Sequence, residues 1–172
     1  MNIIFHTIAA IGVSVAITDT NKINIKSSYK KIILTSVFAF IVGIISHGVL
    51  DYIPHCYPIN SKFDAIASFV LIITFIVLTN KPYKLITALS FAGCIFPDLV
   101  DLLPAILNKY LNLHLKITTK IFPWHWPEYS GSLYNSDCNI SILNQVLLIF
   151  AIITICWFRR TDLKQMMMKN YK

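Results

Sequence analysis

Charge is what this sequence most clearly lacks. Asp, Glu, Lys and Arg together make up 13% of its 172 residues, whereas they make up about a quarter of a typical soluble domain. Apolar residues account for 56% of the chain, and the mean hydropathy is +0.64. This composition favours a membrane protein over the alternative, a soluble helical bundle.

Glycine and cysteine are also scarce, and their positions exclude several kinds of site. The five glycines form neither a phosphate-binding loop nor a G-x-S-x-G nucleophile elbow. The four cysteines contain no C-x-x-C pair and are too scattered for a thiolate zinc site. Cys94 and Cys156 lie in apolar runs, where we expect buried thiols. Cys56 and Cys138 fall in predicted outer loops, where both a disulfide and two free thiols are compatible with the sequence.

The apolar residues are gathered in five runs, each long enough to cross, or nearly cross, a hydrocarbon core of roughly 30 Å. We therefore predict an all-α fold, a polytopic membrane protein with about five transmembrane helices in one bundle. The chain is expected to be a single integral membrane domain over residues 1–172. It would have spans at about 3–17, 32–53, 63–79, 85–107 and 140–158, an outer loop at 108–139 and a basic tail at 159–172.

Two of these spans are less regular than the others. The first could instead be a signal peptide with Ser14-Val15-Ala16 as its cleavage site. However, no Lys or Arg precedes it, and signal peptides begin with a positively charged region. We therefore expect a retained helix. The fourth span contains Pro97 and Asp98, which interrupt its apolar run.

The basic residues predict the orientation of the chain. Eleven of the fifteen Lys and Arg residues fall in the 18–31 loop, the 80–84 loop and the C-terminal tail, which five spans place on one side. Because cytoplasmic loops carry the excess of Lys and Arg, we expect a multi-pass protein of the inner (cytoplasmic) membrane with its N-terminus outside and its C-terminus in the cytoplasm. The net charge of +7 is then mainly a topology signal. It gives the tail an affinity for anionic membrane lipids and no reason to expect nucleic acid as a partner.

Histidines and acidic residues are concentrated on the opposite side. All five histidines and six of the eight acidic residues fall in or near the outer half of the predicted bundle. In the stretch SHGVLDYIPH, His47, Asp51 and His55 follow one another at four-residue spacing, so the first two lie a turn apart on one helix face. Asp98 and Asp101 share a face of the fourth span, and His6 lies early in the first.

Such side chains are costly at membrane depth unless something compensates them. A divalent cation would do so, because imidazole nitrogen and carboxylate oxygen are zinc ligands. The pattern therefore predicts a metal site, with Zn²⁺ as the preferred ion and one or two ions bound. The candidate ligands are His6, His47, Asp51, His55, Asp98 and Asp101.

Simpler interpretations stay open for single residues. His47 and Asp51 could be a structural hydrogen-bonded pair, and Asp98 could cap a helix that restarts after Pro97. Asp64 is expected to be a helix cap. His114 is expected in a surface-lying amphipathic segment. The aromatic residues around His125, in FPWHWPEYS, are expected at the membrane interface.

His6, SHGVLDYIPH and GCIFPDLVD together resemble the bacterial inner-membrane metal-dependent hydrolase family, which is distantly similar to zinc-dependent phospholipase C. Such proteins show an early His, an SHxxxD helix and a PDxxD or PDxDH segment. The resemblance implies His6, His47, Asp51, Asp98 and Asp101 as metal ligands, with His55 as an addition. The sequence departs from the family pattern because Leu102 follows Asp101 where a His can stand. It also lacks an HRxxxHS element, for which His125 in HWPEYS is the only counterpart.

These observations lead us to expect a membrane-embedded metal-dependent hydrolase that acts at the extracytoplasmic face. A phosphoester is expected on the resemblance alone, and a lipid or lipid-linked ester because the site lies near head-group level. His55 or His125 would complete the metal shell. His125 is also a candidate to stabilise developing charge, and Glu128 is a candidate general base. Two alternatives remain: a small cation or proton transporter or metal-handling protein, and a non-catalytic structural membrane protein. The oligomeric state is left open.

Overall fold

The computed structural model describes the whole chain except residues 25–26, 117–118, 134–137 and 169–172. The predicted all-α fold is confirmed. The described residues form seven α-helices and no strand. The helices are α1 (Ile3–Ile17), α2 (Tyr29–Tyr52), α3 (Ser61–Leu78), α4 (Lys84–Asp101), α5 (Leu103–Leu111), α6 (Asn139–Phe158) and α7 (Arg160–Met167), with 3-10 turns η1 (Lys81–Tyr83) and η2 (Pro123–His125).

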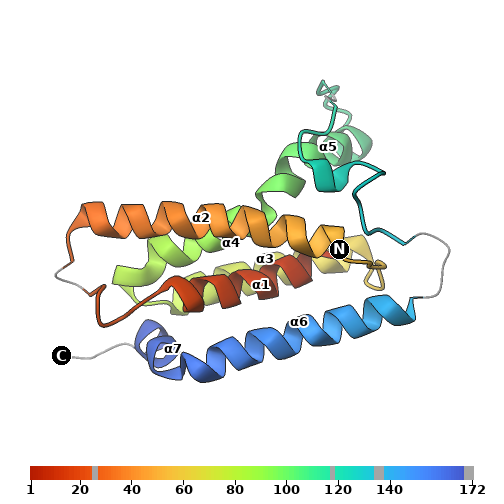
Figure 1. The fold of residues 1–172 in the computed structure, drawn as a ribbon. Helices are drawn as coiled ribbons and strands as arrows, with labels where there is room; N and C mark the ends of the chain where they lie inside the picture. Colours follow the sequence, from red (N-terminus) through yellow and green to blue (C-terminus); the bar gives the residue numbers. More distant parts are fainter. Residues whose placement is uncertain (25–26, 117–118, 134–137, 169–172) are drawn as a thin grey trace.

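Helices α1, α2, α3, α4 and α6 run side by side as a bundle (Figure 1). Helix α4 packs most extensively against α2 and also contacts α1, whereas α6 packs against α1. The N-terminus, α5 and η2 lie at one end, which we call the site end, and α7 lies at the other (Figure 1). Ligand-type side chains from α1, α2 and α4 are thereby brought to the same end of the bundle.

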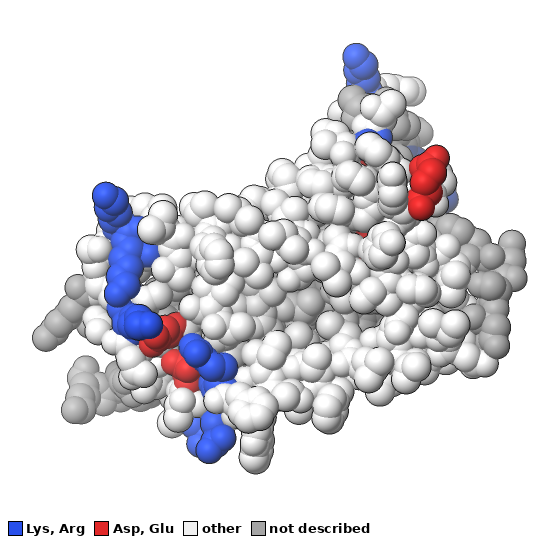
Figure 2. Space-filling view, viewed as in Figure 1, with Lys and Arg blue, Asp and Glu red and all other residues white. Residues whose placement is uncertain are grey.

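Within the part of the chain that the structure describes, four helical segments are long and apolar enough to cross a membrane, and α1 is a shorter apolar helix. The chain is therefore compatible with a multi-pass membrane protein. On the face shown in Figure 2, the middle of the bundle is almost free of charge, and Lys and Arg gather mainly at the end opposite the site end. The apolar surface is typical of helices that face lipid.

The predicted fourth span, 85–107, is not one helix. Helix α4 ends at Asp101, and α5 begins at Leu103 in a new direction. Pro104 is the physical reason, because proline lacks an N–H and its ring clashes with the carbonyl four residues back, so it disrupts a helix interior and is best accommodated in the first turn. Pro97, by contrast, is accommodated inside α4. The break directs α5 away from the bundle.

Helices α2 and α4 approach each other closely through two glycines. A Cβ atom added to Gly43 would lie 2.9 Å from the backbone nitrogen of Cys94, and one added to Gly93 would collide with the carbonyl of Phe40. Small residues at a helix interface allow this kind of backbone contact in membranes. The close approach brings the carbonyl of Cys94 within reach of the His47 ring.

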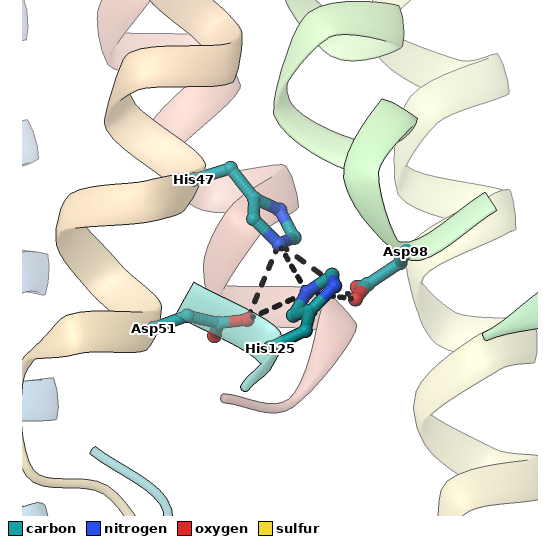
Figure 3. Close-up of side chains that lie close together, drawn as sticks. All are labelled: His47, Asp51, Asp98 and His125. Carbon is teal, nitrogen blue, oxygen red and sulfur yellow. Dashed lines mark hydrogen bonds and ion pairs between the residues drawn. The ribbon is translucent and has the colours of Figure 1, made fainter. Parts of the chain in front are cut away.

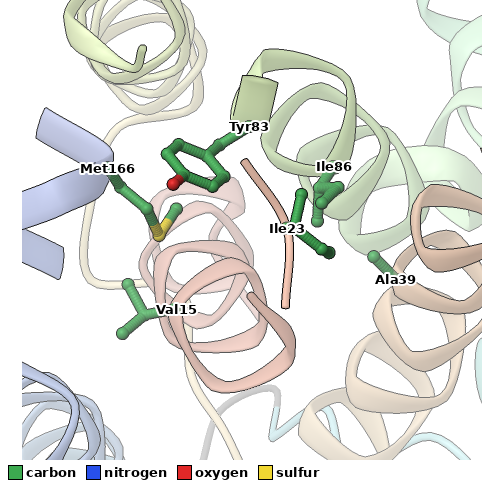
Figure 4. Packing of buried hydrophobic residues seen from close by; sticks show 6 residues of the cluster. All are labelled: Val15, Ile23, Ala39, Tyr83, Ile86 and Met166. Atoms are coloured by element: carbon green, nitrogen blue, oxygen red, sulfur yellow. The ribbon is translucent and has the colours of Figure 1, made fainter. Parts of the chain in front are cut away.

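At the end opposite the site, a cluster of buried side chains joins α1, α2, α4, α7 and the loop after α1 (Figure 4). Its members are Val15, Ile23, Ala39, Tyr83, Ile86 and Met166. Asp162 of α7 ties the same loop down by accepting hydrogen bonds from the backbone nitrogen of Thr20 at 3.0 Å and from its hydroxyl at 2.7 Å. This end is therefore a structural core.

Asp64 caps a different helix from the one that contains it. Its carboxylate accepts hydrogen bonds from the backbone nitrogens of Ile3 at 2.8 Å and Ile4 at 2.9 Å, and from the amide of Asn2 at 3.1 Å. The N-cap of α3 is instead Asn60. The contact fixes the start of α1 and hence the position of His6, one turn further on.

Asp64→Ala is therefore expected to lower the free energy of unfolding by about 2 kcal/mol, because three donors at a buried helix start lose a charged acceptor. Thermal unfolding of the detergent-solubilised protein, followed by circular dichroism, measures the effect. Glu128→Ala removes an exposed carboxylate and serves as the control. Equal melting temperatures for the two variants would contradict the capping role.

Candidate metal centre

Four ligand-type side chains meet at the site end of the bundle (Figure 3). His47 and Asp51 project from successive turns of α2, Asp98 comes from the last turn of α4, and His125 comes from η2. Each offers one ligand atom, and these four atoms lie within 4.8 Å of one another. We call these residues the four-residue cluster. The i, i+4 spacing in SHGVLD explains one half of it.

The cluster has the dimensions of a tetrahedral site. Five distances between its ligand atoms, namely His47 Nε2, Asp51 Oδ2, Asp98 Oδ1 and His125 Nε2, range from 3.2 to 3.7 Å. Ligands placed about 2.0–2.1 Å from a central zinc ion are separated by roughly 3.3–3.4 Å in a regular tetrahedron. The residues present therefore fit a zinc ion in both donor chemistry and spacing.

Contacts on the far side of each imidazole orient its ligand nitrogen. The Nδ1 atom of His47 lies 2.7 Å from the carbonyl oxygen of Cys94, which can only accept, so Nδ1 carries the hydrogen. The Nδ1 atom of His125 lies 2.8 Å from Asp101 Oδ2. Both interactions turn Nε2 inward, as the outer partners of metal-bound histidines do.

Asp101, a predicted ligand, lies outside the four-residue cluster. Besides the ring of His125, its carboxylate accepts hydrogen bonds from the backbone nitrogens of Ile121 at 2.8 Å and Phe122 at 3.0 Å. It thus ties the segment before η2 to the end of α4. Sequence spacing placed Asp98 and Asp101 on one helix face. The structure gives them different partners, because Asp98 faces the other ligand atoms and Asp101 binds the loop before η2.

Gly48, between the two α2 members of the cluster, provides the surface on which η2 packs. A Cβ atom there would lie 2.7 Å from the indole ring of Trp124. The absence of a side chain lets the indole lie against the α2 backbone, which brings His125 into the cluster. The sequence contained both residues but no local signal that they meet.

The cluster is buried and rich in negative charge. The side chain of His47 is fully buried, Asp51 and His125 are nearly so, and Asp98 is the most exposed of the four. Burial disfavours a charged imidazole, but hydrogen bonds to the carboxylates of Asp51, Asp98 and Asp101 outweigh it and raise the pKa of His125 to about 10. Two carboxylates facing two imidazoles would together balance the charge of one divalent ion.

His6 contacts the other oxygen of Asp51, and His55 is linked to that oxygen through the amino group of Met1. The Nε2 atom of His6 lies 3.1 Å from Asp51 Oδ1, and its ring stacks on that of His47 with centroids 4.0 Å apart. The amino group of Met1 lies 2.6 Å from the same oxygen and 2.7 Å from His55 Nε2. Burial, reinforced by that amino group, lowers the pKa of His55 to about 4.

The remaining candidates lie elsewhere. Glu128 is exposed in the turn after η2 and is not among the described residues that form the cluster. His114 is also exposed and has a positive φ of 51°. His125, expected as a catalytic residue, lies inside the cluster instead, where its Nε2 faces the same point as the other ligand atoms.

The loops around the site are held together covalently. Cys56 and Cys138 form a disulfide that joins the segment after α2 to the start of α6. Beside it, the backbone of His55 pairs with the segment at 131–133 through two hydrogen bonds of 2.8 Å. Cys94 is a buried free thiol, and Cys156 is a half-buried one. The pairing therefore fixes the loop that carries His55.

Replacing Cys56 by serine is expected to lower the free energy of unfolding by about 4 kcal/mol. The disulfide closes a loop of 82 residues, and a cross-link across a long loop removes more conformational entropy from the unfolded chain than one across a short loop. Thermal melts with and without reductant provide the measurement. Reductant should lower the melting temperature of wild type and of the control Cys156→Ala, but not that of Cys56→Ser. A reductant-insensitive wild type would contradict the prediction.

No protein-family model, curated protein or solved structure matches this chain.

Proposed function

We propose that this protein is a membrane-embedded, metal-dependent hydrolase that cleaves a phosphoester or lipid-linked ester. The observation that carries the proposal is the four-residue cluster, whose ligand atoms have tetrahedral spacing at the edge of a cavity. His47, Asp51, Asp98 and His125 would hold the ion. Zinc bound there would act as a Lewis acid and lower the pKa of a water molecule to about 7.

A catalytic role is favoured over a purely structural one by the position of the cluster. Structural zinc sites are closed and usually contain cysteine, whereas catalytic sites keep one face open. Asp51, Asp98 and His125 all line the cavity, so a substrate can approach from that side. A catalytic ion needs one position for water, and Asp98, the most exposed of the four, is the ligand that could give up its place to the attacking water and accept its proton. Glu128 does not line this cavity and has no role in the proposal.

His6 and His55 support a second ion in the same proposal. His6 contacts Asp51 Oδ1, and His55 lies on the other side of the Met1 amino group, while the cluster uses Oδ2. A carboxylate can bridge two metals about 3.5–4 Å apart. In the structure, the amino group of Met1 takes the place between these groups. The stoichiometry of bound metal distinguishes one ion from two.

The site end is proposed to face outward from the inner membrane. Lys and Arg gather mainly at the opposite end (Figure 2), as cytoplasmic ends do. The disulfide lies at the site end, and disulfides persist in extracytoplasmic compartments. A reporter fused after Lys172 should therefore be active in its cytoplasmic form, and an extracytoplasmic signal would overturn this orientation.

Metal analysis of the purified protein tests the proposed function. We expect one or two equivalents of zinc, measured by mass spectrometry, with hydrolysis of a lipid phosphoester in the same preparation. A chelator should remove both the metal and the activity, and added zinc should restore both. A folded protein that takes up no metal from a zinc solution would overturn the proposal and leave the cluster as a polar contact between α2, α4 and η2.

A further inference from the structure

The cavity beside the four-residue cluster is large enough for an organic ligand. Its volume is about 760 Å³, within the range of roughly 300–1,000 Å³ typical of ligand pockets. Three of the four cluster residues form part of its wall. Whatever occupies the cavity therefore lies against the proposed metal site.

One wall of the cavity is apolar and is created by the break in the chain after α4. Leu99 comes from the end of α4 and Leu102 from the break itself, while Leu103 and Ile106 come from the first two turns of α5. Residues 103, 106 and 110 share one face of α5 because they are three and four positions apart. This wall suits a hydrocarbon chain.

The cavity adjoins the apolar outer surface of the bundle. Helix α3, which forms another side, has only 11% of its residues buried, and its side chains Phe63 and Ile66 are each 65% exposed. In a membrane these side chains would face lipid. A membrane lipid could therefore enter the cavity from the surrounding bilayer, with its hydrocarbon chain lying on the apolar wall.

Positive charge is brought to the same cavity from three segments. Lys62 of α3 and Lys109 of α5 lie 5.9 and 5.6 Å from the ring centroid of Tyr110, so the two ammonium groups are held beside the same ring. Lys120 also lines the cavity and donates a hydrogen bond of 2.8 Å to the carbonyl of His125. Only four basic residues, Lys62, Lys109, Lys116 and Lys120, fall in the sequence segments of the site end, and three of them line this cavity.

We propose that the cavity binds a membrane lipid with an anionic, phosphate-containing head group, and that this lipid is the substrate. The lipid chain lies against Leu103 and Ile106, and the phosphate is held by Lys62 and Lys109. The part of this inference that makes the lipid a substrate rests on the proposed function, whereas the part that concerns lipid binding does not. In that reaction the water oxygen forms a new bond to phosphorus, the bond from phosphorus to the leaving oxygen breaks, and one water proton ends on that oxygen.

Lipid binding by the full-length protein in detergent tests the inference. The probe is phosphatidic acid with eight-carbon chains, followed by native mass spectrometry. It should bind more tightly than phosphatidylcholine of the same chain length, whose head group has no net charge. The double variant Lys62→Gln/Lys109→Gln should bind phosphatidic acid about 10- to 30-fold more weakly. The control Lys30→Gln/Lys164→Gln removes two exposed charges at the opposite end and should bind like wild type.

Two further arms separate the contributions of chain and head group. Ile106→Trp places a larger side chain in the space next to the apolar wall. It should weaken the binding of phosphatidic acid although Lys62 and Lys109 are unchanged. Glycerol 3-phosphate, which has no chain, should not compete at concentrations where the lipid saturates the site. Equal affinity of wild type and the Lys62/Lys109 variant, or effective competition by glycerol 3-phosphate, would overturn the inference.

Zinc content measured on the same samples separates this inference from the proposed function. Loss of lysine-dependent lipid binding in a protein that retains zinc would refute the lipid site alone. Lysine-dependent lipid binding in a protein that takes up no zinc would refute the hydrolase and leave the lipid site standing.

Discussion

His47→Gln is expected to remove zinc from the protein while leaving the helical bundle folded. The variant loses one of the four inward-facing ligand atoms, and glutamine fills a similar volume without supplying an imidazole nitrogen. Loss of an outer-shell partner typically weakens metal binding by about 10- to 100-fold, so loss of a ligand should weaken it by more than about 100-fold. Titration of the chelator-stripped protein with zinc measures the change, and hydrolysis should fall with it.

The control for this substitution is His114→Gln. His114 is an exposed histidine in the segment after α5, so its loss changes the histidine count without touching the cluster. Asp98→Asn is a second ligand variant on a different helix and should lose zinc in the same way. If both ligand variants bound zinc as wild type does, with unchanged melting temperatures, the cluster would not be the metal site.

The helices of the bundle could be predicted from the sequence because apolar runs of sufficient length have few other folds open to them in a membrane. The predicted first span coincides with α1, and the second, third and fifth lie within a few residues of α2, α3 and α6. The fourth was wrong beyond Asp101. Hydropathy alone does not show where a new helix begins in another direction, because apolar residues continue on both sides of the break.

Half of the candidate site could likewise be predicted from local spacing. His47 and Asp51 share a helix face by periodicity alone, and Asp98 could be assigned to the same membrane level. The position of His125 depends on a loop that returns to α2 after more than 70 residues, seated by the contact of Trp124 with Gly48. Such a contact has no periodic signal.

The helix that Asp64 caps also depends on tertiary packing, which local sequence does not reveal. A carboxylate near the start of a helix ordinarily suggests a cap for that helix. Here the neighbouring start of α1 provides two backbone donors, and Asn60 already caps α3. Only the packing of α1 beside α3 decides which donors the carboxylate reaches.

Transport receives little support from the arrangement of polar groups. The described members of the cluster and the cavity beside it lie at one end of the bundle (Figure 1). The opposite end contains the apolar cluster of Figure 4, and the buried acid described there, Asp162, is hydrogen-bonded to Thr20. An ion pathway requires polar or ionisable groups across the membrane. A hydrolase needs them only where water and substrate meet.

Asp101→Asn is expected to weaken zinc binding by about 10- to 100-fold although all four proposed ligands remain. Asp101 accepts hydrogen bonds from three donors, including Nδ1 of His125. An asparagine has one acceptor oxygen, so its NH₂ group would face at least one of those donors. The imidazole of His125 then loses the partner that keeps the hydrogen on Nδ1, and a hydrogen on Nε2 would block the ligand atom.

A positioning role for Asp101 predicts a change that simple destabilisation would not produce. In the zinc-loaded protein, nitrogen NMR of labelled histidine should show the Nδ1–H form of His125 in wild type and a loss of that form in Asp101→Asn. The matched control is Asp162→Asn, which removes a buried carboxylate at the end opposite the site, where it accepts hydrogen bonds from Thr20. It should lower the melting temperature and leave zinc affinity unchanged. Equal zinc affinity in Asp101→Asn and wild type would show that the proposed metal site does not depend on this contact, and that Asp101 serves only to hold the segment before η2 against α4.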